Sequence, residues 1–192
     1  MATTRVDRGS TETTTVYTEG PEMVMERTFD APRDLVWKVM TDPERITNWW
    51  GPHGYTTTVE EMDVRQGGRW RFIQHTTGGE DVPFKGEYLE VVPPERLVQT
   101  FIFDVEPFNN EAAVTTLTLE DVGGRTKLVS RDRYPSVESL EGALSTGMIG
   151  GALQTWDRLA TARSCRASGP MRPTSASAIH PWLPRSTRRM QT

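Results

Sequence analysis

The chain has 192 residues, 35% of them hydrophobic and 25% charged, and this length predicts one domain with tails because a domain averages about 150 residues. No run approaches the roughly 20 apolar residues that a membrane-spanning helix needs, so the composition predicts a soluble protein. The 22 basic and 26 acidic residues give a net charge of -4, which favours neither nucleic acid nor an anionic membrane as a partner. The one cysteine, Cys165, excludes an intrachain disulfide and a cysteine-based metal cluster, and it suits a reducing, cytoplasmic location.

The two ends of the chain differ in composition from the middle. Residues 1–20 hold seven threonines and no apolar run, so we expect a disordered polar leader and no secretory signal. Residues 163–192 hold six Arg, four Pro and no acidic residue, which predicts a basic, disordered tail. Such a tail could contact an acidic partner or the acidic surface of the domain, or it could be an inert extension. The domain itself is expected over residues 21–162.

The domain should begin with a strand followed by two short helices. Residues 22–29 have the composition of a strand. Asp30 and Pro32 then predict a helix start, with Asp30 as the N-cap, and this helix should end near residues 41–43. Residues 42–50 predict a second short helix that Asp42 caps and that Gly51 and Pro52 close.

Strand signals then follow one another at short intervals. They cover residues 56–64, 69–76, 84–92, 96–104, 112–120 and 126–134. The connections between them are short, whereas a parallel pairing would need a crossover of about a dozen residues each time. The sequence therefore predicts an antiparallel meander.

After Pro135 the hydrophobic period becomes helical and predicts a long C-terminal helix that covers the sheet. The glycines within it, at positions 142, 147, 150 and 151, each weaken a helix by about 1 kcal/mol relative to alanine. One explanation is close packing against the sheet, or a break near residues 147–151. The other is that the missing side chains leave a cavity under the helix.

Several ordered segments carry a resemblance to a known family. They are RTFDAP (27–32), LVW (35–37), TDP (41–43), WWGP (49–52), DVR (63–65), GGRWRF (67–72), GEYLEVVPPERL (86–97) and WDRL (156–159). Over residues 22–162 the chain resembles the START-like (SRPBCC) superfamily, in the branch of heat-shock-protein-90 ATPase activator homologues. The resemblance implies an α+β helix-grip fold, in which a curved antiparallel sheet of about six to seven strands wraps around a long C-terminal helix with an apolar cavity between them. Residues 147–152 and the segment after Arg163 depart from the family pattern.

Strand alternation places aromatic and polar side chains on one face of the sheet. The residues expected to line a ligand-binding cavity there are Trp50, His53, Trp70, Phe72, Gln74, Gln99, Phe101, Phe103, Leu117, Ser130, Asp132, Met148, Ala152 and Trp156. An aromatic wall with a few polar groups is the usual make-up of a small-molecule site, although the same aromatics could simply fill the core.

Three positions in this set carry particular expectations. Asp132 could pair with an arginine, hydrogen-bond a ligand, or lie at an exposed strand end, since a buried unpaired carboxylate is costly. Trp50 could wall the cavity entrance or anchor the short helix by packing, and His53 could offer a polar group or lie in solvent. His75 is expected on the outer face, opposite Trp70.

Catalytic signals are scarce. The histidines at positions 53, 75 and 180 lack metal-ligand spacing, and nucleotide-binding and nucleophile-elbow motifs were not found, so we assign no catalytic residue, metal or cofactor. An acid–base pair of Asp132 with His53 or Tyr134 stays possible, because such pairs leave no local motif. The arginines at positions 69, 71, 131 and 133 are interpreted as a solvated outer face, and not as a nucleic-acid site.

Three functional hypotheses follow. The first is a non-enzymatic protein that binds a hydrophobic or amphipathic small molecule between the sheet and the C-terminal helix. The second, implied by the resemblance, is a stress-response module that acts on a chaperone. The third is a cyclase- or hydrolase-like enzyme that uses the same cavity. The sequence names no ligand, and it leaves open whether the protein is a monomer or a homodimer.

Overall fold

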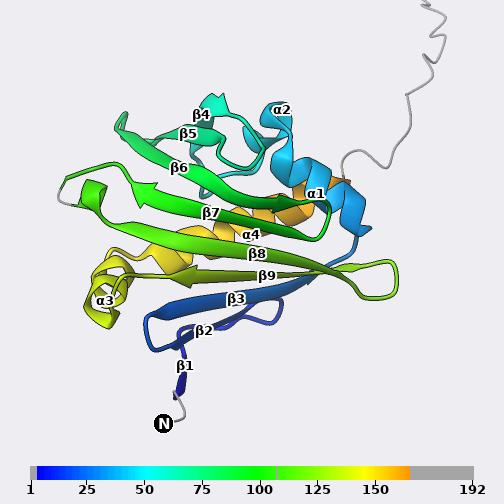
Figure 1. Cartoon of the computed structure of the whole chain (residues 1–192), viewed down its shortest axis with the longest axis horizontal. Helices are drawn as coiled ribbons and strands as arrows, with labels where there is room; N and C mark the ends of the chain where they lie inside the picture. The colour runs from blue at the N-terminus through cyan, green and yellow to red at the C-terminus, as the bar shows by residue number, and fades with distance from the viewer. Residues whose placement is uncertain (1–3, 107, 165–192) are drawn as a thin grey trace, which may run out of the picture.

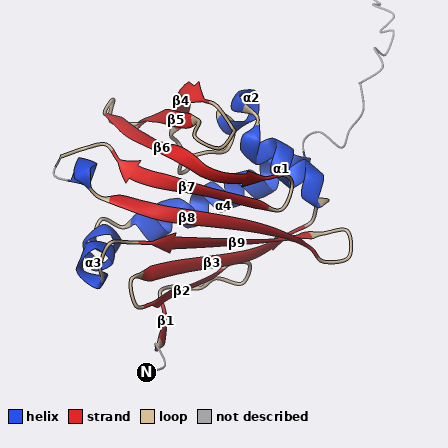
Figure 2. Cartoon of the chain, viewed as in Figure 1, coloured by secondary structure: helices blue, strands red, loops and turns tan. Residues whose placement is uncertain are grey.

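The computed structural model describes residues 4–106 and 108–164, and within them the strands form a single antiparallel sheet with helices on one face (Figures 1 and 2). The nine strands lie in the order β1-β2-β3-β9-β8-β7-β6-β5-β4. Their bounds are β1 Arg5–Asp7, β2 Thr15–Glu19, β3 Glu22–Phe29, β4 Thr56–Met62, β5 Arg69–His75, β6 Asp81–Val92, β7 Arg96–Phe103, β8 Ala112–Asp121 and β9 Thr126–Arg133. The helices are α1 Arg33–Thr41, α2 Pro43–Ile46, η1 Phe108–Asn110, α3 Val137–Ser145 and α4 Met148–Ser164.

The expectation of a disordered leader over residues 1–20 is wrong where the structure describes it. Strands β1 and β2 extend the sheet beyond β3, so the sheet has two strands more than the six to seven expected. Val16 is fully buried and pairs in register with Met25, while the guanidinium of Arg5 lies 3.3 Å from the ring centroid of Tyr17. The β-branched side chains of this segment favour a strand once a neighbouring strand and a core are available, although the segment has no long apolar run.

The meander from β4 to β9 is confirmed, as each strand pairs antiparallel with the next along the chain. β6 begins earlier than predicted, at Asp81, and β9 returns to pair with β3. Because α1 and α2 connect β3 to β4, the chain crosses from the middle of the sheet to its far edge through these two helices (Figure 1).

The two short helices are confirmed, with corrections at the first N-cap and at the end of the second helix. Helix α2 ends at Ile46 with Thr47 as its C-cap, and it does not continue to residue 50. Asp42 caps α2 as predicted, since its carboxylate accepts the Glu44 backbone N–H at 3.0 Å. The N-cap of α1 is Pro32 and not Asp30, and no side chain caps this helix. The extended ψ of 146° at Pro32 places the helix start two residues later than an Asp30 cap would.

The predicted C-terminal helix is divided in two. The chain breaks between α3 and α4 at Gly147, whose φ of 80° lies in the left-handed region that glycine adopts most easily. A Cβ at Gly150 would meet no atom within 4 Å, and one at Gly151 would lie 3.4 Å from Pro52. The break and the close approach to Pro52 therefore account for two of the glycines, and exposed Gly150 faces open space rather than a cavity under the helix.

Helix α4 packs across one face of the sheet and closes one end of the core (Figure 1). Phe29 and Trp156 lie 5.9 Å apart between ring centroids, and Leu128 and Leu159 are fully buried beside them. Among the residues that the structure describes, no helix combines the length and the apolar character required to cross a membrane. Apart from Arg163 and Ser164, which end α4, the tail predicted over residues 163–192 lies outside the described residues.

Candidate functional site

The inner face of the sheet, which faces α4, carries an aromatic cluster. Its members are Trp50, Trp70, Phe72, Phe84, Phe101 and Phe103, and neighbouring rings in it lie 5.0 to 6.5 Å apart between centroids. Strands β5, β6 and β7 supply all but Trp50, which comes from the loop after α2. The structure thus brings together the aromatic residues expected to line a cavity, except Trp156, and adds Phe84.

The members of the aromatic cluster differ in burial. Trp70 and Phe72 are 2% and 4% exposed and belong to the packed core, whereas Trp50, Phe101 and Phe103 are partly exposed. Trp70 lies against Gly86, where a Cβ would come within 2.5 Å of the indole Nε1, and that buried N–H has no hydrogen-bond partner. The core interpretation therefore holds for the deeper rings, and the outer rings are the ones that a ligand could reach.

A row of polar side chains crosses the inner face next to the aromatic cluster. The strand register places Gln99 beside Thr115 and Thr115 beside Asp132. The Thr115 hydroxyl donates to Asp132 Oδ1 at 2.5 Å, and the Ser130 hydroxyl donates to Oδ2 at 3.1 Å. Asp132 is thus held in one orientation by two neutral donors.

Asp132 lies deep in the fold and still retains accessible surface. Thr115 and Ser130 are each 6% exposed and Met23, its partner on β3, is 2% exposed, yet Asp132 is only half-buried. Burial raises the pKa of the Asp132 carboxyl above its ordinary value, while the two hydroxyl hydrogen bonds act in the opposite direction. The carboxyl group is consequently a desolvated group on the inner face of the sheet, and not a residue of an open strand end.

Helix α4 contributes Met148 and Ala152, both partly exposed and packed against the core. The Tyr134 hydroxyl donates to Met148 Sδ at 3.4 Å, and burial, together with the nearby Asp132, raises the pKa of Tyr134. Trp156 lies further along α4 at the closed end of the core, 8% exposed and packed on Phe29. Of the three α4 residues predicted to line the cavity, Met148 and Ala152 are therefore partly exposed, and Trp156 belongs to the packed core.

The loop that carries Trp50 is fixed to α4 by hydrogen bonds to its backbone. Arg158 Nη1 donates to the carbonyl oxygens of Gly51 and Pro52 at 2.9 Å each. Gln154 Oε1 accepts the backbone N–H of His53 at 3.0 Å, but the His53 side chain is exposed. His53 thus lies at the outer edge of the loop, and among the described residues its side chain makes no hydrogen bond to the polar row.

Gln74 lies beneath the same loop. A Cβ at Gly51, where φ is 106°, would come within 2.8 Å of Gln74 Nε2, and Gln74 is 8% exposed. The carbonyl oxygen of Trp50 accepts a hydrogen bond from the Thr57 hydroxyl at 2.6 Å. Gln74 therefore supports the loop from below.

His75 lies on the outer face, as expected. Its Nδ1 is 2.7 Å from Asp81 Oδ1 and its Nε2 is 2.8 Å from the Thr58 hydroxyl. The outer face also carries ion pairs such as Arg71 with Asp104 at 2.5 Å, which agrees with the interpretation of its arginines as solvated.

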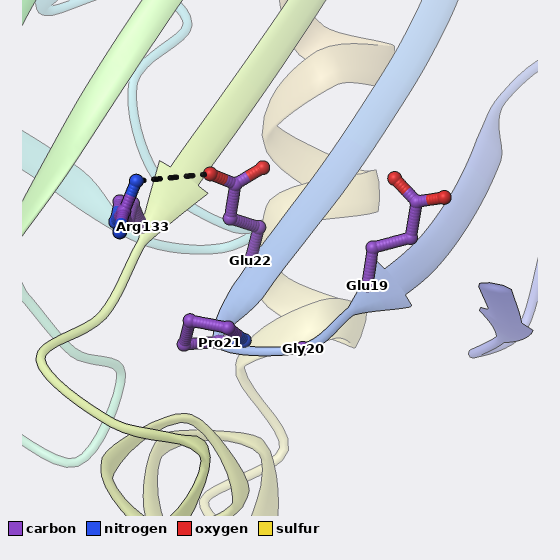
Figure 3. A pocket seen from close by; sticks show the side chains of 5 residues that line it. All are labelled: Glu19, Gly20, Pro21, Glu22 and Arg133. Carbon is purple, nitrogen blue, oxygen red and sulfur yellow. Dashed lines mark ion pairs between the residues drawn. The ribbon is translucent and has the colours of Figure 1, made fainter. Parts of the chain in front are cut away.

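Two surface hollows lie away from the inner face. One, of about 360 Å³, is formed at the β2–β3 hairpin by Glu19, Gly20, Pro21 and Glu22 with Arg133 (Figure 3). The other, of about 460 Å³, lies between residues 12–15, residues 26–28 and Lys127. None of the residues predicted to line a cavity belongs to either hollow.

The fold agrees with comparisons to known proteins. The family model described as "Activator of Hsp90 ATPase homolog 1-like protein" matches residues 30–163, and the chain belongs to this family. No curated protein matches the chain.

Solved structures from several bacteria are similar to it. Protein Ms6760 from Mycobacterium smegmatis is 25% identical with a TM-score of 0.67, over 76% of this chain and 95% of that one. Protein CV1439 from Chromobacterium violaceum is 26% identical with a TM-score of 0.65, over 73% and 95%. A protein from Arthrobacter aurescens shares the fold at 20% identity, with a TM-score of 0.74 over 86% and 98%.

Sequence reasoning missed three contributors to this region. Thr115 could have been found by alternation, because it lies two residues before Leu117 on the same face of β8. Phe84 was the first residue of the strand predicted over residues 84–92, whereas β6 begins at Asp81 and Phe84 lies within it. Arg158 left no signal, since its partners are backbone carbonyl groups about a hundred residues earlier in the chain.

Proposed function

We propose that the protein binds a hydrophobic or amphipathic small molecule between the inner face of the sheet and α4. The observation that carries this proposal is the residual exposure of inner-face residues in the middle of the sheet. Leu117 on β8 is partly exposed, although its register partners Leu97 and Ser130 are 5% and 6% exposed. A side chain on the covered face of a central strand is accessible where it borders space beside or under the covering helices.

The other end of the inner face, in contrast to the region of Leu117, is fully covered. There Leu119 and Leu128 are 2% and 0% exposed, and Trp156 covers Phe29. The space is thus expected near the Met148 end of α4, where Leu117, Asp132, Phe101 and Ala152 surround it. Apolar surface there would supply affinity, at about 25 cal/mol per Å² removed from water, and the polar row would orient the ligand.

The proposal is tested with the neutral apolar probe N-phenyl-1-naphthylamine, whose fluorescence rises on transfer to an apolar site. The variant Ala152→Phe fills the proposed space from α4. The variant Ala112→Phe adds the same ring on the outer face of β8, where its register partner is Ile102. We expect saturable binding to the natural protein and to Ala112→Phe, and loss of at least about ten-fold in affinity in Ala152→Phe. Equal binding by both variants would contradict the proposed location.

The family name favours a second candidate, an interaction with a chaperone. A matched family model supports only the fold and its relatives, because one fold serves many functions. The test is stimulation of heat-shock-protein-90 ATPase activity by the purified chain; no stimulation at high concentration excludes this role. A cytoplasmic location fits both candidates, and sedimentation would distinguish a monomer from a homodimer.

An enzyme in the same site is the third candidate, and the geometry favours it least. Asp132 receives its hydrogen bonds from hydroxyl groups, and its neighbour Tyr134 donates to Met148. A general base acts within hydrogen-bond reach of the proton that it removes, and the exposed His53 side chain forms no hydrogen bond with Asp132. A pH-dependent turnover that Asp132→Asn abolishes would support catalysis.

A further inference from the structure

The Asp132 carboxylate has no positively charged partner among the residues that the structure describes. Its sequence neighbours Arg131 and Arg133 point to the outer face, where both contact Glu22, at 3.6 and 3.8 Å. Arg27, on the adjacent strand β3, pairs with Asp157 at 2.6 Å. Arg8, whose Nε donates to the Thr18 hydroxyl at 3.0 Å, forms an ion pair with Glu141. These basic side chains are therefore paired with other carboxylates.

The two hydroxyl donors do not exhaust what this carboxylate can accept. Two carboxylate oxygens offer about four acceptor positions, and Thr115 and Ser130 occupy one on each oxygen. Both donors are neutral, and no positive charge among the described residues pairs with this carboxyl, so burial raises its pKa and its charged form lacks a counter-charge. A buried charge of this kind is stabilised chiefly by an opposite charge with good hydrogen-bond geometry.

Polar and apolar side chains lie on different sides of Asp132. Gln99 and Thr115 continue the polar row on one side. On the same face, Leu117 lies two residues after Thr115 and Phe101 two residues after Gln99. Met148 accepts the hydrogen bond of Tyr134, two residues after Asp132. A ligand that fits both parts has an apolar body and one charged end.

From this arrangement we infer that the ligand is a cationic amphiphile, in which an amine or ammonium group pairs with Asp132 and the apolar body lies against Leu117, Phe101 and Met148. This inference rests on the proposed function, because it names the ligand class of that same site. The net charge of this part of the chain also favours a cationic ligand. Residues 1–162 hold 16 basic and 26 acidic residues, and a negatively charged domain attracts cations. The carboxylate of a fatty acid would form no such charge pair with Asp132.

The test compares three probes with the same ten-carbon chain: decylamine, decan-1-ol and decanoate. Their binding to the full chain is measured by isothermal titration calorimetry near neutral pH, below the concentrations at which they aggregate. The variant Asp132→Asn keeps the size of the side chain and removes its charge. The control Glu87→Gln makes the same charge change at an exposed position of β6 whose side chain forms no ion pair with the described residues.

We expect decylamine to bind the natural protein at least about ten-fold more tightly than decan-1-ol, and decanoate to bind most weakly. Asp132→Asn should lower the affinity for decylamine by about ten-fold and leave that for decan-1-ol unchanged, whereas Glu87→Gln should change neither. Equal affinities of the natural protein for amine and alcohol would overturn the inference and leave the binding site standing. Absence of binding by all three probes would overturn the proposed function itself. The comparison of probes on the natural protein decides the question even if Asp132→Asn fails to fold.

Discussion

Arg158 on α4 donates a hydrogen bond to the carbonyl oxygen of Gly51, more than a hundred residues earlier in the chain, at 2.9 Å. The same Nη1 lies at the same distance from the carbonyl oxygen of Pro52, and Nη2 donates to that of Asn48 at 3.3 Å. Burial lowers the pKa of Arg158, which has no carboxylate partner among the described residues. One charged side chain therefore fixes the loop that carries Trp50 over the aromatic cluster.

Replacing Arg158 by glutamine should lower the free energy of unfolding by about 2 kcal/mol, because several charge-assisted hydrogen bonds are lost and the carbonyl groups lose their donor. Urea denaturation followed by circular dichroism measures this change. The control is Arg69→Gln, since Arg69 is exposed and its contact with Glu61 is 3.5 Å long; its effect should stay within about 0.5 kcal/mol. Equal effects of the two variants would show that Arg158 does not hold the loop.

The break between α3 and α4 predicts opposite effects of the same substitution at two glycines. Gly147→Ala should destabilise the protein by about 1 kcal/mol, since φ is 80° there. Gly142→Ala lies within α3, where a Cβ would meet no atom within 4 Å, and should stabilise it by about 0.5 to 1 kcal/mol. Thermal unfolding of the two variants gives the signs, and a stabilising Gly147→Ala would mean that α3 and α4 are one continuous helix.

The N-terminal strands predict that part of the apparent leader is structural. Val16→Ala should cost about 2 kcal/mol, because Val16 is fully buried against the inner face. Val6→Ala, on exposed β1, should change stability by less than about 0.5 kcal/mol. Chemical denaturation of the pair checks this, and a neutral Val16→Ala would restore the idea of a disordered leader.

Asp132 predicts a pH dependence of stability with a definite sign. Its carboxyl pKa is raised in the folded state, chiefly by burial, so the folded protein holds this proton more tightly than the unfolded chain does. The natural protein therefore loses stability relative to Asp132→Asn as the pH rises from the ordinary aspartate value through the raised one. Tyr134, the titratable neighbour, has its own pKa raised by burial and stays protonated throughout this range.

Unfolding free energies of both proteins, measured between about pH 3.5 and about pH 7, test this sign, because all other carboxyl groups are common to the two. The difference between them should shift in favour of Asp132→Asn with rising pH. A shift in the other direction would mean that the folded protein stabilises the charged carboxylate.

Local patterns and ordered motifs predicted most of the fold. Alternation along β5, β7 and β9 put Phe72, Phe101 and Ser130 on one face, and the register places their strands as the meander requires. The N-terminal strands escaped prediction because Val16 and Tyr17 form too short an apolar segment to stand out without the pairing of β2 with β3. A strand of this kind depends on tertiary partners more than on its own propensity.

The candidate site was less accessible to sequence reasoning. Asp132 could be identified as an inward carboxylate, but its orientation depends on Thr115 across the sheet, and pairing between strands is not local information. His53 was selected for its side chain, but that side chain is exposed, and it is the backbone N–H of His53 that donates a hydrogen bond to Gln154. Side-chain contacts to backbone atoms, such as those of Arg158, leave no pattern to read.

The measurement that tests the central claim most directly is native mass spectrometry of the freshly purified protein, compared with the same sample after denaturation. The account predicts an additional mass that is bound to the folded chain and lost on denaturation, and in the Asp132→Asn variant a lower occupancy of any bound amine. If the folded protein has the mass of the chain alone, and added decylamine and decan-1-ol produce no bound species, the inner face is a filled core and the account of a ligand-binding protein is contradicted.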